Sequence, residues 1–147
     1  MKYPIGIQSF DQIIEDGYVY VDKTDLVYKL VKEGKIYFLS RPRRFGKSLL
    51  ISTLKSYFQG KKDLFKGLAI DKLETEWAEY PVFHIDFNGG YFDKDGELQK
   101  RIMGYVETWE SQWGKDPFNE EIGMRFAYVL KQAHAKTGKR AVVLIDE

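Results

Sequence analysis

The chain contains no cysteine among its 147 residues, which excludes disulfides and thiolate metal sites. It also lacks a strong net charge, because 23 Lys and Arg balance 22 Asp and Glu to give +1. No global field therefore favours nucleic acid or an anionic membrane. No apolar run resembles a signal peptide or is long enough to span a bilayer. We therefore expect a cytoplasmic protein without a membrane partner.

Aromatic and apolar residues are plentiful, at 16% and 44% of the sequence. A chain of this length can bury a sizeable core, and aromatic side chains mostly supply buried area. We therefore assign most of the rings to a core in preference to an exposed base-stacking surface.

Predicted strands and helices alternate along most of the chain. Apolar spacing and capping residues predict helices at 9–14, 24–33, 47–58, 97–113 and 119–135. Runs of β-branched and aromatic residues predict strands at 35–40, 81–87 and 140–147. This order is typical of an α/β fold with a parallel sheet flanked by helices.

The stretch "FLSRPRRFGKSLL" (38–50) lies between the first predicted strand and a predicted helix. Gly46 allows the backbone to approach a phosphate closely, Lys47 supplies an amine for the terminal phosphates, and Ser48 supplies a hydroxyl for magnesium. The usual phosphate-binding loop has a first glycine where this chain has Arg41, followed by Pro42. The motif is therefore incomplete by itself, although its strand–loop–helix context is correct.

A second motif, "VVLIDE", ends the chain with Asp146 and Glu147 after four apolar residues. This is the form of a Walker B strand, in which the aspartate orders the magnesium shell and the glutamate polarises the attacking water. The two motifs occur in the expected order, about a hundred residues apart, and together favour nucleotide binding.

The segments "YVDKT", "YFLSRPRRFGKS", "YPVFHIDFN" and "VVLIDE" resemble the AAA-ATPase-like domain that is widespread in bacterial proteins, often with a C-terminal PD-(D/E)XK nuclease-like domain. The resemblance covers essentially the whole chain, and the missing first glycine is that family's own form of the loop. It implies a P-loop NTPase-type sheet and an ATPase activity that uses ATP and Mg²⁺. The catalytic residues that it implies are Lys47 and Glu147, and the metal-binding residues are Ser48 and Asp146. The implied nucleotide-binding residues are Arg43, Arg44, Phe45, Gly46, Lys47, Ser48 and Leu49.

The resemblance also implies that residues 1–147 are the N-terminal part of one P-loop domain, truncated after the Walker B strand. Residues 1–34 would form a helical segment and residues 35–147 a partial nucleotide-binding core. Tyr20, Val21 and Asp22 match a stretch that contributes to the adenine pocket in related ATPases. A strand that normally separates the two motif strands would be missing, so we expect self-association or a distorted sheet. Hydrolysis by this chain alone would then be weak or absent.

Two other functions are compatible with parts of the sequence. The basic run "RPRR" (41–44) could bind nucleic acid, although the near-neutral net charge weighs against this and any nucleic-acid role is expected only through the full-length protein. A metal hydrolase would have to use His84, Asp86 and His134. Its two histidines are far apart and lack ligand spacing, which disfavours this alternative.

Overall fold

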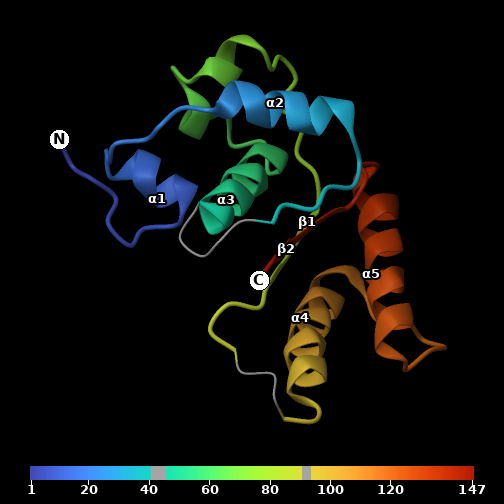
Figure 1. Cartoon of the computed structure of the whole chain (residues 1–147). Helices are drawn as coiled ribbons and strands as arrows, with labels where there is room; N and C mark the ends of the chain where they lie inside the picture. Colours follow the sequence, from blue (N-terminus) through green and yellow to red (C-terminus); the bar gives the residue numbers. More distant parts are fainter. Residues whose placement is uncertain (41–45, 91–93) are drawn as a thin grey trace. The chain divides into compact units, whose positions relative to one another are not determined.

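The computed structural model describes residues 1–40, 46–90 and 94–147. The chain divides into two compact units, Met1–Glu79 and Tyr80–Glu147, and each is described by itself. In both units the elements can be followed in Figure 1. The expected division into a helical segment (1–34) and a partial core (35–147) stays a prediction.

The first unit is helical. It contains α1 (Phe10–Glu15), α2 (Thr24–Glu33), α3 (Lys47–Phe58) and two short 3₁₀ helices, η1 (Lys62–Phe65) and η2 (Ala69–Lys72). Its core is aromatic, since Phe10, Tyr57 and Phe65 are buried together with Ile70. The rings of Phe10 and Phe65 lie 4.7 Å apart between centroids. Burial of these large side chains holds short helices that would be unstable alone.

Hydrogen bonds fix the start of two helices in this unit. The Ser52 hydroxyl on α3 accepts a hydrogen bond of 2.8 Å from the Phe10 amide at the start of α1. Asp22 accepts bonds from the amide and hydroxyl of Thr24 through Oδ1 and from the Ala69 amide through Oδ2. Asp22 thus joins the start of α2 to η2.

The second unit contains β1 (Val82–Asp86), α4 (Glu97–Trp113), α5 (Ile122–Thr137) and β2 (Val142–Asp146). The two strands form a parallel pair in which Val82 is opposite Val142 and Asp86 is opposite Asp146. Phe83 on β1 is buried with Val129 and Ala133 of α5, and its ring meets Trp109 of α4 edge-on. The two helices therefore cover the Phe83 face of β1. The alternation of strands and helices confirms the predicted α/β class with a parallel pair, whereas the larger P-loop sheet stays a prediction.

The prediction of a buried strand at 35–40 is wrong. These residues belong to no strand, and the side chains of Ile36 and Phe38 are 94% and 88% exposed. An extended segment becomes a strand only when its backbone groups pair with a neighbour. Within the described residues the sheet has two strands, β1 and β2, and neither pairs with residues 35–40. Direct pairing of the first and third predicted strands is likewise not observed.

Candidate functional site

The start of α3 has the geometry of an anion-binding helix end. Gly46 precedes the helix with φ 79° and ψ 16°, a left-handed conformation that glycine adopts readily. An added Cβ at Gly46 would meet no atom within 4 Å, so the backbone conformation, and not crowding, requires glycine here. Lys47 and Ser48 are the first two residues of the helix. The first amides of an α-helix have no partner within the helix, so they can donate to a ligand.

This helix start differs from those of the other described α-helices in its charge. Asp11, Asp25 and Glu97 lie in the first turns of α1, α2 and α4. Glu121 caps α5, and the hydrogen bonds that its carboxylate accepts from the Gly123 and Met124 amides lower the pKa of Glu121. The first turn of α3 has no acidic residue, and Gly46 offers no side-chain cap. The positive end of the helix dipole is therefore not compensated by an acid of its own first turn or cap.

The other residues predicted to bind nucleotide have different positions. The Leu49 side chain packs against the aromatic core of the first unit, so only its backbone could face a ligand. The Leu49 carbonyl already accepts a hydrogen bond from Thr53. Arg43, Arg44 and Phe45 lie outside the described residues, as does the "RPRR" run.

In the second unit, the carboxyl ends of β1 and β2 bring two acids together. Asp146 ends β2, and its register partner is Asp86, which ends β1. Paired residues of neighbouring parallel strands are about 4.8 Å apart and point to the same face. Asp146 is only 6% exposed, whereas Glu147, directly after the strand, is exposed. The structure thus places the predicted metal ligand Asp146 beside Asp86.

Side chains of α4 brace the end of β1. The Tyr105 hydroxyl accepts a hydrogen bond from the Asp86 amide and donates one to its carbonyl, at 3.1 and 3.2 Å. Arg101 Nη1 donates to the same carbonyl at 2.9 Å. The Asp86 Oδ1 atom accepts from the backbone and side-chain nitrogens of Asn88. Sequence reasoning missed Arg101, although its spacing of four residues from Tyr105 places both on one face of a helix.

The residues matched to an adenine pocket serve the fold of the first unit. The Tyr20 ring packs edge-on against Phe10, with centroids 5.2 Å apart, and burial raises the pKa of Tyr20. Partial burial of Asp22 acts to raise its pKa, but the bonds from Thr24 and Ala69 outweigh it and lower the pKa. The Val21 side chain is exposed. Tyr20 and Asp22 therefore have structural partners, and their role in binding adenine stays a prediction.

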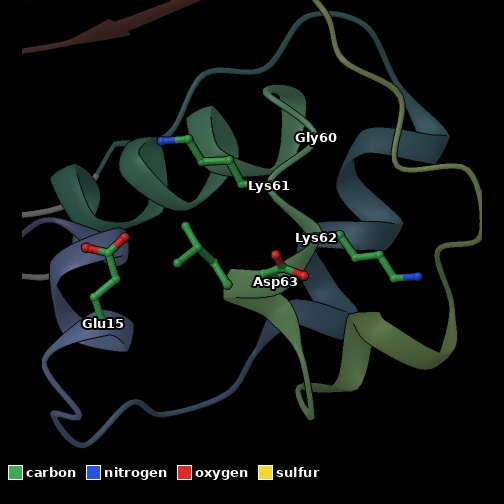
Figure 2. A pocket seen from close by; sticks show the side chains of 6 residues that line it. Glu15, Gly60, Lys61, Lys62 and Asp63 are labelled. Atoms are coloured by element: carbon green, nitrogen blue, oxygen red, sulfur yellow. The ribbon is translucent and has the colours of Figure 1, made fainter.

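A shallow depression of about 340 Å³ lies beyond the opposite end of α3, lined by Glu15, Lys61, Asp63 and their neighbours. Figure 2 shows the side chains of Lys61 and Lys62 pointing in different directions, so they do not converge on one ligand. The 12-residue helix α3 is about 18 Å long, and its carboxyl end is the negative end of its dipole. This depression is therefore distant from the start of α3 and is unsuited to a phosphate.

The metal-hydrolase alternative is not supported by the geometry. His84 lies on β1, whereas His134 lies on α5 with its Nδ1 atom 2.9 Å from the Lys139 carbonyl oxygen. Across residues 1–40, 46–90 and 94–147, no three His, Cys, Asp or Glu side chains are grouped to hold a metal. The same ranges contain no helix with the length and hydropathy that a membrane crossing requires.

Comparison with known proteins shows the family to which the chain belongs. Residues 4–147 match the family described as "Predicted AAA-ATPase", and the chain belongs to this family. It is 43% identical over 148 residues to the "Uncharacterized protein in vnfD 5′ region" of Azotobacter chroococcum mcd 1. That alignment covers 99% of this chain but 28% of the relative, so the chain spans little more than a quarter of that protein's length. No solved structure matches the chain.

Proposed function

We propose that the chain is the ATP-binding module of a P-loop ATPase. The observation that carries this proposal is the start of α3, where Gly46, Lys47 and Ser48 combine free helix amides with an amine and a hydroxyl. Membership of the Predicted AAA-ATPase family supports it, because that family points to nucleotide and Mg²⁺ use in general.

Each unit would contribute a different kind of group. In the first unit, the amides at the start of α3 and the Lys47 amine would neutralise phosphate oxygens, and the Ser48 hydroxyl would hold Mg²⁺. In the second unit, Asp146 would orient the metal shell and Glu147 would align water for attack on the terminal phosphate. The Asp146 carboxylate fits this role because it is buried and accepts no hydrogen bond from the described residues. When bound, Mg²⁺ would supply positive charge that stabilises the transferred phosphoryl group.

The Mg²⁺-dependent hydrolysis itself is assigned to the longer protein of which this domain would be one part. Calorimetric titration of the 147-residue chain with ATP, with and without Mg²⁺, tests the binding role. Lys47→Ala should weaken Mg²⁺–ATP binding by about a hundredfold, because bonds to a charged group contribute about 1.5–3 kcal/mol. Lys55→Ala, in the last turn of the same helix, removes a lysine of the same type and should leave the affinity unchanged.

Equal losses in the two variants would show a general charge effect and not a specific phosphate site. An unchanged affinity in Lys47→Ala would refute the assignment of this loop. The "RPRR" alternative predicts a different result, since excess ATP would then leave nucleic-acid binding intact and raised salt would abolish it.

A further inference from the structure

The paired acids at the ends of β1 and β2 carry an unbalanced charge. Asp86 and Asp146 are register partners in a parallel pair, so both carboxylates project from the same face at the same edge. Like charges in directly opposite positions of a sheet destabilise it. Within the described residues, the ion pairs join other side chains, Lys32 to Glu74, Lys100 to Glu97 and Arg125 to Glu110. None of these three ion pairs includes Asp86 or Asp146.

Burial makes the lack of a partner for the Asp146 carboxylate more unfavourable. The residue is only 6% exposed, and its carboxylate has no hydrogen-bond or ion-pair partner among the residues that the structure describes. Burying a carboxylate without a partner is unfavourable, so such a group normally binds a metal ion or another cation. The Asp86 carboxylate is partly satisfied, because Oδ1 accepts two hydrogen bonds from Asn88, and Oδ2 has no such partner in the same set of residues.

From this arrangement we propose that Asp86 and Asp146 form a two-carboxylate site for a hard divalent cation such as Mg²⁺, with Asp86 as a ligand alongside the Walker B aspartate. Oxygen-only ligation suits Mg²⁺ or Mn²⁺, and Mg²⁺ is commonly held by one or two carboxylates while water or phosphate completes its shell. This site deepens the proposed function, yet it lies wholly in the second unit and needs no nucleotide.

Tyr105 and Arg101 act as positioning residues for this site. They hold the backbone amide and carbonyl of Asp86 through α4, while Asn88 orients its carboxylate. The Phe87 amide donates to the Asp146 carbonyl at 2.8 Å, which extends the parallel pairing just beyond the two acids. The two carboxylates are thus attached to backbone that is held in fixed register.

Titration of the 147-residue chain with Mn²⁺ alone, followed by electron paramagnetic resonance of the free ion, tests the site. We expect one bound ion, and about tenfold weaker binding in Asp86→Asn and in Asp146→Asn. Glu107→Gln, which removes one negative charge from an exposed position on α4, serves as the matched control and should bind Mn²⁺ as the unmodified chain does. Equal affinity in Asp86→Asn and the unmodified chain would overturn the proposal.

Two further measurements do not depend on that comparison. In the unmodified chain, bound Mn²⁺ should broaden the amide resonances of Phe87 and Glu147 first, and broadening centred elsewhere would overturn the proposal. Without metal, Asp86→Asn should raise the melting temperature, since it removes a like-charge repulsion. If Mn²⁺ binds at the two acids but ATP does not bind, the proposed function is wrong and this site stands. If ATP binds equally well to Asp86→Asn and no Mn²⁺ binds in the absence of nucleotide, this site is wrong and the proposed function stands.

Discussion

The start of α3 and the ends of β1 and β2 present opposite chemistries. At the start of α3, Gly46 and Lys47 leave positive charge and free amides without an acidic cap. At the ends of the strands, Asp86 and Asp146 leave negative charge without a basic partner among the described residues. Under our proposals, an anion would bind at the start of α3 in the first unit and a cation at the ends of the strands in the second.

The contrast extends to how the two units satisfy their other charges. In the second unit, Arg125 donates two hydrogen bonds to Glu110, and both side chains are nearly buried. In the first unit, Glu74 is held by Tyr57 and by Lys32 at 3.4 Å. Buried charges elsewhere in each unit thus have partners in the chain, which makes the unpartnered groups at the two motifs informative.

The largest expected effect on stability comes from truncating one large buried side chain in the core of each unit in turn. Phe65 in the first unit and Phe83 in the second are 0% and 1% exposed. Phe65→Ala and Phe83→Ala should each lower the unfolding free energy of its own unit by about 3–5 kcal/mol, because each leaves a cavity. Amide hydrogen exchange, measured residue by residue, separates the units. Faster exchange of both units in both variants would show that they unfold together.

A smaller effect is expected from the buried pair between α4 and α5. Hydrogen bonds from Arg125 lower the pKa of Glu110. Because the folded-state pKa is below the unfolded value of about 4.3, this stabilisation is present above that pH and is lost as the pH falls through the folded-state pKa. Glu110→Gln should lower the melting temperature at pH 7 by roughly 5 °C. It should also flatten the acid side of the stability profile, and thermal melts from pH 3 to 7 check both. If the melting temperatures of Glu110→Gln and the unmodified chain changed in parallel with pH, Glu110 would not be the source of this pH dependence.

The smallest expected effect on stability comes from substituting the glycines that precede α3 and α4, and it allows these two helix starts to be compared directly. Gly46 and Gly96 both precede helices in a left-handed conformation, with φ 79° and 88°, and an added Cβ meets nothing within 4 Å at either position. Gly46→Ala and Gly96→Ala should therefore cost about the same stability, roughly 1–2 kcal/mol each. Only Gly46→Ala should also weaken ATP binding, as calorimetry would show. Equal loss of affinity in both would indicate that strain alone, and not the phosphate-binding geometry, is responsible.

Local sequence patterns predicted several elements well. The helices predicted at 47–58 and 97–113 are observed with those bounds as α3 and α4, because their apolar spacing and flanking glycines act within a few residues. The strand predicted at 140–147 is β2, which is shorter at both ends (Val142–Asp146), and α5 begins at Ile122, three residues after the predicted start at 119. The strand predicted at 35–40 fails, because strand formation requires a neighbour whose presence the local pattern does not encode.

The sequence alone predicted the candidate nucleotide-binding groups, which are the Gly46-Lys47-Ser48 run before a helix and the Asp146-Glu147 pair after a strand. These motifs depend on neighbouring residues, so local composition suffices to find them. Only the tertiary structure decided that Asp86 is the register partner of Asp146, that Tyr105 and Arg101 hold the end of β1, and that Asp22 serves the fold. The physical reason is that strand register and the packing of distant side chains are set by long-range contacts, which a single linear sequence does not specify.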